Sequence, residues 1–279
     1  MSLMKFDLHC HSYYSDGHLS PTELVALASE KEITHLALTD HDTLNGLPEA
    51  RVAAQEHQIE LINGVELSCS WNSQLLHVVG LGFDPENKKL LAGIAENTER
   101  RLIRAEAMIE DFAANGINLK DEVESLLDKA VPTRPHFAQA LINLGYAKDK
   151  KQAFKRYLVH GKTGYIAMQW PDISLISKWI SEAGGVAVLA HPMRYKFTRT
   201  KLVRLIEDMK MFGIQGIEVS TPITNPQQSE MLTKLSLEHD LFASIGSDFH
   251  SHDQPWARLG GAMPLPPHSK PITQLFLKN

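Results

Sequence analysis

The stretch FDLHCHSYYSDG, residues 6–17, places His9 and His11 one residue apart at the end of a short apolar run, with Asp16 five residues later. Side chains at positions i and i+2 of a strand project to the same face, so both imidazoles can bind one ion from one side. Cys10, which lies between them, is expected to point to the opposite face. The first strand and turn therefore predict metal ligands.

Composition limits the class of protein. The chain has 279 residues and 43% hydrophobic content, which fits one main domain with a large core. It has no run long enough to span a membrane and no secretory signal, so we expect a cytoplasmic protein. Two cysteines exclude a disulfide framework and a four-thiolate zinc site. The net charge of −5 argues against indiscriminate polyanion binding but leaves room for a local phosphate site.

Short apolar runs alternate with amphipathic segments along most of the chain. This alternation is typical of a parallel sheet or a closed barrel, and seven candidate strands favour the barrel. Between residues 97 and 168 the helical period continues without a strand. We therefore expect an α/β barrel formed by residues 1–96 and 169–279, with a helical insertion at 97–168 that covers the active site.

The polar residues of the predicted strands fall mainly at strand ends, which meet at one face of such a barrel. Nine imidazole or carboxylate groups are expected to converge there: His9, His11, Asp16, His41, Glu66, His77, His191, Asp248 and His250. Mixed nitrogen and oxygen ligands suit zinc, manganese or iron, and nine of them suffice for two or three ions. Asp16 and His77 are equally compatible with orienting a neighbouring ligand. Glu218 fits either an ion pair or a ligand.

The motifs DLHCHSYYSDG, ALTDHD, GVELS, LLHVVGLGF, AHP and GSDFH together resemble those of the PHP (polymerase and histidinol phosphatase) family of metal-dependent phosphoesterases. The resemblance implies a distorted (β/α)7 TIM-like barrel and a trinuclear centre. One ion would bind His9, His11, Glu66 and Asp248, a second Asp16, His41 and His250, and a third Glu66, His77 and His191. Glu66, His191 and Asp248 would be catalytic. Manganese is the expected metal, with zinc, iron or magnesium as alternatives.

Within that family, the segment PTRPHFAQALINLG resembles the corresponding segment of one bacterial group of enzymes. Members of this group hydrolyse nucleoside 3′,5′-bisphosphates and trim 5′-phosphorylated RNA from its 5′ end. This resemblance implies hydrolysis by a metal-bridged hydroxide and makes Arg134, His136 and Arg194 candidate phosphate contacts. In the alternative, Thr133 caps a helix and Arg134 is a solvated flank. A basic run is either an RNA guide or a solvated helix face: it comprises Lys148, Lys150, Lys151, Lys155 and Arg156.

Other functions remain open at this point. A histidinol-phosphate phosphatase would share the barrel, although the position of the insertion argues against it. A metal-binding module without turnover would be expected to have lost ligands, and this chain has the full set. An amidohydrolase would require a metal-bridging lysine where the chain has Glu66. We expect a nucleoside bisphosphate or short 5′-phosphorylated RNA as the substrate, with no membrane and no obligatory protein partner.

Overall fold

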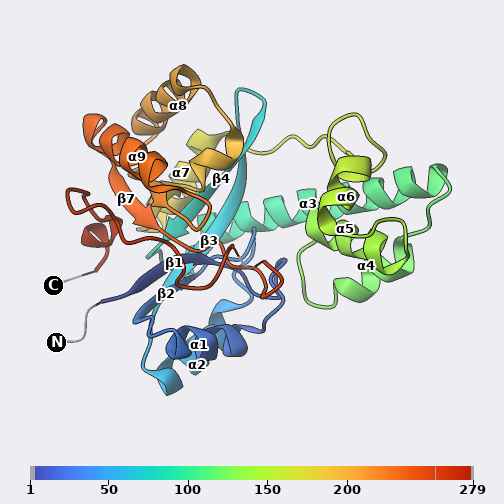
Figure 1. The fold of residues 1–279 in the computed structure, drawn as a ribbon, viewed down its shortest axis with the longest axis horizontal. Coiled ribbons are helices and arrows are strands. Elements are labelled where there is room, and N and C mark those ends of the chain that lie inside the picture. Colours follow the sequence, from blue (N-terminus) through green and yellow to red (C-terminus); the bar gives the residue numbers. More distant parts are fainter. Residues whose placement is uncertain (1–3, 255, 278–279) are drawn as a thin grey trace.

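The computed structural model describes residues 4–254 and 256–277. Its seven strands form one sheet in sequence order, and Figure 1 shows them wrapped into a barrel. The strands are β1 (Phe6–Cys10), β2 (His35–Leu38), β3 (Glu60–Trp71), β4 (Gln74–Leu81), β5 (Val186–Leu189), β6 (Gly216–Ser220) and β7 (Phe242–Ile245). The segment after β7 returns to β1, where the Asp248 amide donates to the His9 carbonyl at 2.7 Å. The barrel is therefore nearly closed, and the predicted α/β barrel is confirmed.

One part of the predicted alternation is wrong. β4 runs antiparallel to both β3 and β5, so it is not a further β-then-α unit. Only Asn72 and Ser73 separate β3 from β4, and both have positive φ angles, which suits a tight hairpin turn. A two-residue turn cannot lead into a parallel strand, because a parallel connection needs a long crossover. Glu66 and His77 consequently lie within strands and not at strand ends.

Helices cover the outside of the barrel. The segments α1 (Pro21–Glu30) and α2 (Leu47–His57) pack on β1 and β2, with Cys10 in the core that they share. A capping box formed by Ser20 and Glu23 begins α1. The other side carries α7 (Ile173–Glu182), α8 (Arg199–Met211) and α9 (Pro226–Glu238) (Figure 1). These helices bury the apolar face of β3 and its neighbours, while the alternate side chains of β3 face the barrel opening.

A helical lobe lies to one side of the barrel (Figure 1). It contains the distal part of α3 (Lys88–Ala114), then α4 (Lys120–Leu126), α5 (Arg134–Asn143), α6 (Lys150–Ala153) and a π-helical turn, η1 (Phe154–Leu158). A separate apolar core holds it together, with Phe112, Phe137 and Leu141 at its centre. The lobe falls within the segment predicted as an insertion. The proposed boundary at residue 97 lies inside α3, which runs continuously from the barrel into the lobe.

Two short 3-10 turns complete the described chain. The first, η2 (Pro192–Tyr195), follows directly after β5, and the second, η3 (Ile272–Leu275), lies in the proline-rich tail. Ala243 of β7 donates to the carbonyl of Lys270, which holds this tail against the barrel. No helix among the described residues is long and apolar enough to cross a membrane.

Candidate metal centre

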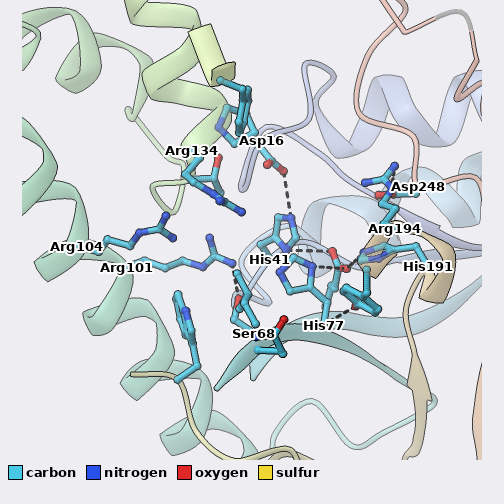
Figure 2. Close-up of a pocket in the computed structure, with 18 of the residues that line it drawn as sticks. Asp16, His41, Ser68, His77, Arg101, Arg104, Arg134, His191, Arg194 and Asp248 are labelled. Atoms are coloured by element: carbon cyan, nitrogen blue, oxygen red, sulfur yellow. Dashed lines mark hydrogen bonds and ion pairs between the residues drawn. The ribbon is translucent and has the colours of Figure 1, made fainter. Parts of the chain in front are cut away.

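The nine predicted ligands lie together at the barrel opening, and Glu66 is at their centre. One oxygen of Glu66, Oε2, lies 3.0 Å from His41 Nδ1, 3.2 Å from His11 Nε2 and 3.3 Å from His9 Nε2. The other oxygen, Oε1, lies 2.9 Å from both His77 Nδ1 and His191 Nε2. A single carboxylate of β3 is thus surrounded by five imidazoles. Three of them, His41, His77 and His191, are labelled in Figure 2.

The remaining carboxylates flank this arrangement. Asp248 Oδ1 lies 3.3 Å from His11 Nε2 and 3.6 Å from His9 Nε2. Asp16 Oδ1 lies 3.3 Å from His250 Nε2 and 3.8 Å from His41 Nε2. All nine predicted ligands therefore lie in one contiguous cluster.

The donor atoms fit cations better than they fit one another. Within the described residues, the buried atoms Asp16 Oδ1, His41 Nδ1 and Glu66 Oε2 have no hydrogen-bond partner of acceptable geometry. Such groups are costly to bury unless something binds them. His9 Nε2 also lies only 3.1 Å from His11 Nε2. A cation that accepts a lone pair from each nitrogen accounts for this approach.

Among the described residues, three sets of donor atoms lie close enough to share an ion. The first is His9, His11, Glu66 and Asp248, which is the set expected for one ion. The second joins His11 to the expected trio of Asp16, His41 and His250. The third contains Glu66 and His77 with His41, whereas the resemblance implied His191. His191 contacts the same carboxylate of Glu66, so its role as a ligand stays a prediction.

Glu218 of β6 positions two of these ligands. Its Oε1 lies 2.7 Å from His9 Nδ1, and its Oε2 accepts from the His191 amide. A proton held on Nδ1 leaves the Nε2 lone pair of His9 free for an ion. Glu218 was left open as an ion pair or a metal ligand; it pairs with His9 and, among the described residues, is in none of the groups that could share an ion.

Backbone geometry also positions the ligands. His191 and Asp248 have φ angles of 31° and 50°, in the left-handed region that side chains rarely adopt. Such residues tend to cluster at functional sites, where the surrounding fold maintains the strain. Next to them, Gly246 approaches β1 so closely that a Cβ atom there would lie 2.3 Å from the Cβ of His9. The chain after β7 therefore needs a glycine beside the first ligand.

Charge in the cluster is balanced from one side by Arg194 of η2. Its Nη2 lies 2.6 Å from Asp248 Oδ2. Burial opposes ionisation of Asp248, but Arg194, and after it His9 and His250, hold the pKa of this carboxyl well below its ordinary value. Asp248 is therefore an ionised, acceptor-only group, as a metal ligand must be.

A second group of cations enters the same cavity from the helical lobe (Figure 2). This arginine cluster consists of Arg101 and Arg104 of α3 and Arg134 of α5, and it lines a cavity of about 530 Å³ together with Asp16, His41, Glu66 and Asp248. Arg101 is paired with Asp42 at 2.6 Å, whereas buried Arg104 Nε has no partner among the described residues. Burial, followed by Arg134 and Arg101, lowers the pKa of Arg104 to about 10. Such mutually repelling guanidinium groups are suited to an anionic ligand.

The three predicted phosphate contacts differ in placement. Arg134 lines the cavity, and so does Arg194, beside Asp248. His136 instead completes the capping box of α5, because its Nδ1 accepts from the Thr133 amide at 3.1 Å. The alternative reading therefore holds for the cap but not for Arg134, which faces the cavity. A substrate role for all three stays a prediction, and the contact of His136 does not favour one.

Four further residues line the cavity that the sequence motifs did not single out: Arg101, Arg104, Tyr165 and Trp170. The two arginines lie in the charged segment TERRLIRAEA, which resembles a solvated helix face. A usable signal was present, because Arg101, Arg104 and Ala105 follow Asn97 at helical spacing and share the buried face of α3.

The model of the PHP domain family matches residues 7–166 of this chain. The chain belongs to the PHP domain family. A 5′-3′ exoribonuclease of Haemophilus influenzae is 41% identical over 98% of this chain and 99% of its own length. A 3′,5′-nucleoside bisphosphate phosphatase of Chromobacterium violaceum is 41% identical over 97% of this chain and 95% of its own length. The 5′-3′ exoribonuclease Rnm of Escherichia coli is 36% identical over 97% of this chain and 93% of its own length.

Solved structures share this fold. A Chromobacterium violaceum structure described as an amidohydrolase, with sulfate bound and no metal, superposes with a TM-score of 0.91 at 41% identity over 97% of this chain and 95% of its own. A Bifidobacterium adolescentis structure described as a metal-dependent phosphoesterase has a TM-score of 0.83 at 29% identity over 92% of this chain and 91% of its own. The predicted PHP fold and phosphoester hydrolase class are confirmed.

Proposed function

We propose that this protein removes the 3′-phosphate from nucleoside 3′,5′-bisphosphates and, at the same site, releases nucleoside 5′-monophosphates from the 5′ end of 5′-phosphorylated RNA. One observation carries the proposal: a single cavity is lined both by seven of the nine predicted ligands and by the arginine cluster. A bisphosphate has two anionic groups to place, and the cavity offers two distinct places. The names of the relatives from Haemophilus influenzae and Chromobacterium violaceum support both substrates.

Two or three divalent ions suit the ligand cluster, with manganese first and zinc, iron or magnesium as alternatives. We assign the expected ligand sets to them, with Glu66 shared between sets. Bound there, such ions supply an activated water at neutral pH and neutralise charge on a phosphoryl group.

The side chains of the chain itself would share the remaining work. Glu66, His191 and Asp248 are the proposed catalytic residues, because they surround the position expected for the 3′-phosphate. Arg194 can donate to that phosphate once substrate competes for its contact with Asp248. Arg134, with Arg101 and Arg104, would hold the 5′-phosphate and so fix which ester bond lies at the ligand cluster. Tyr165 and Trp170 offer flat surfaces for the nucleoside.

The proposal places the enzyme in the cytoplasm, where nucleotides and RNA ends are formed, and requires no protein partner. A substrate panel tests it. With manganese present, kcat/KM for adenosine 3′,5′-bisphosphate should exceed that for histidinol phosphate or an aryl phosphate by at least roughly 100-fold, because only the bisphosphate also occupies the arginine cluster. A preference for histidinol phosphate would replace this function with the alternative phosphatase.

A further inference from the structure

A second cavity, of about 1030 Å³, opens from the ligand cluster in another direction. We call it the lysine groove. Its outer part is lined by Lys150 and Lys151 of α6, Lys155 of η1, and Trp256 and Gln254 from the chain after β7. Five residues line both the groove and the active-site cavity, which makes the two continuous: Asp16, Pro135, Phe154, Arg194 and His250.

The groove has unbalanced positive charge. None of its three lysines forms an ion pair with another residue of the described ranges. Its three acidic side chains are already engaged: Asp16 contacts His250 and His41 in the ligand cluster, Asp149 accepts from the Gln152 amide at 2.7 Å as a helix cap, and Asp253 lies 3.7 Å from His18. Three unpaired ammonium groups beside the active-site cavity favour a ligand with several negative charges, such as a nucleic-acid backbone.

The groove also offers a stacking surface. Trp256 is 59% exposed although it is large and apolar, and Phe154 lies at the junction with the active-site cavity. Single-stranded nucleic acid is bound by this combination, in which cations follow the phosphates and aromatic rings stack on the bases. Not every basic residue of the segment takes part. Arg156 lies over the Tyr157 ring and donates to the Tyr146 carbonyl, and Lys148 does not line the groove.

We infer that the lysine groove binds the part of a single-stranded RNA that lies 3′ of the bond being cut. The inference rests on the proposed function, which places the 5′-phosphate on the arginine cluster and the scissile phosphate on the ligand cluster. The next nucleotides then need a way out of the ligand cluster, and the groove, which shares Asp16, Arg194 and His250 with the active-site cavity, offers one. A bisphosphate has no chain on that side and leaves the groove empty.

This difference between the two substrates defines the test. The variant Lys150→Gln/Lys151→Gln/Lys155→Gln removes the charge, and Trp256→Ala removes the stacking surface. A matched control, Lys88→Gln/Lys178→Gln/Lys210→Gln, changes the net charge equally at exposed lysines outside the groove. For each manganese-loaded protein, kcat/KM is measured on adenosine 3′,5′-bisphosphate and on 5′-phosphorylated RNAs of two to six nucleotides.

The unaltered protein should act faster on longer RNA until the groove is filled. The triple groove variant should lose this length dependence and keep bisphosphate hydrolysis within twofold. The slope of log kcat/KM for RNA against log salt concentration measures how many phosphate contacts are made. Losing three contacts should make this slope less steep by about 2. Raising salt from about 50 to about 200 mM should therefore reduce RNA cleavage roughly 20-fold more in the unaltered protein than in the variant. Trp256→Ala should lower kcat/KM on RNA about tenfold.

Three outcomes would overturn the inference. Unchanged RNA kinetics in the groove variants would show that the chain leaves elsewhere, and an equal loss on bisphosphate and RNA would show that the lysines bind the 5′-phosphate instead. If the unaltered protein hydrolyses the bisphosphate but does not cleave RNA, the inference is wrong and the protein is a small-molecule phosphatase. Failure on both substrates would overturn the proposed function itself.

Discussion

Glu218 shows how much of the site depends on single side chains that bind no substrate. It contacts His9 through one oxygen and the His191 amide through the other, so it fixes two of the nine predicted ligands. The sequence predicted all nine, because each is a histidine or carboxylate in a recognisable motif near one face of the barrel. It did not decide whether Glu218 forms an ion pair or binds a metal, because both roles require a carboxylate in the same place.

Replacing Glu218 by glutamine tests this role. The amide has nearly the same size, but it presents an NH₂ group toward either His9 Nδ1 or the His191 amide, where an acceptor is needed. Manganese affinity should fall by roughly 10- to 100-fold with little change in thermal unfolding. Equilibrium metal titration measures the affinity, and Glu238→Gln at the exposed end of α9 is the control. Unchanged affinity would remove Glu218 from the ligand assembly.

The variant Arg134→Ala tests whether the arginine cluster binds the 5′-phosphate of the substrate. Removing the guanidinium should raise KM for adenosine 3′,5′-bisphosphate by roughly tenfold or more, since a charge-assisted contact to the 5′-phosphate is lost. An aryl phosphate has no such group, so its kinetics should change less than twofold. Steady-state assays of Arg134→Ala and of the exposed control Arg204→Ala provide the comparison. Equal losses on both substrates would make Arg134 a structural residue.

At the scale of elements, α3 connects the barrel to the helical lobe. Asp42, in the loop after β2, accepts from Arg101 Nε at 2.6 Å and from Asn97 Nδ2 at 2.7 Å. Arg101 also donates to Ser68 of β3 at 2.8 Å. The helical period of this segment was visible in the sequence. Its docking was not, because contacts between residues about 55 positions apart leave no local pattern.

Asp42→Asn should weaken this docking. Asparagine tolerates the positive φ of residue 42, so the main change is a buried Arg101 without its counter-charge. Loss of one partner of a buried ion pair is expected to lower the free energy of unfolding by about 3 kcal/mol. Urea unfolding measures it, with the exposed Asp121→Asn of α4 as the control. A change below about 0.5 kcal/mol would show that α3 is held by apolar packing alone.

The sequence predicted where the strands lie but not the direction in which each of them runs. Every strand was found, because apolar runs mark strands whichever way they point. The antiparallel placement of β4 was missed, although Asn72 and Ser73 mark a hairpin turn. The error did not move the site, because His77 lies opposite Ser68 and so faces the same side of the sheet as Glu66.

At the scale of the whole molecule, the barrel concentrates buried carboxylates at one end. Asp16, Glu66, Glu218 and Asp248 are all buried there, and Arg194 forms an ion pair with one of them, Asp248. Bound cations would relieve this charge and would bind the folded chain only. The order of the motifs along the chain was enough to predict that their ligand residues meet at one end of the barrel, since the fold brings all of these motifs to the same opening.

Metal removal should therefore lower thermal stability as well as activity. At about 100 times the dissociation constant, a ligand adds about 2.7 kcal/mol to the free energy of unfolding. For a chain of this size the midpoint Tm should rise by roughly 5 °C or more on addition of manganese. Calorimetry of chelated and manganese-loaded protein measures the shift, and Asp248→Ala should reduce it. An equal Tm with and without manganese would contradict a metal site in the cluster.

The most direct test of the account follows the products of adenosine 3′,5′-bisphosphate by chromatography, before and after chelation and again after manganese is restored. With the arginine cluster holding the 5′-phosphate and the ligand cluster acting on the 3′-phosphate, the products should be adenosine 5′-monophosphate and phosphate. They should appear only with metal present. Adenosine 3′-monophosphate as the product, or hydrolysis that persists without metal, would contradict the account.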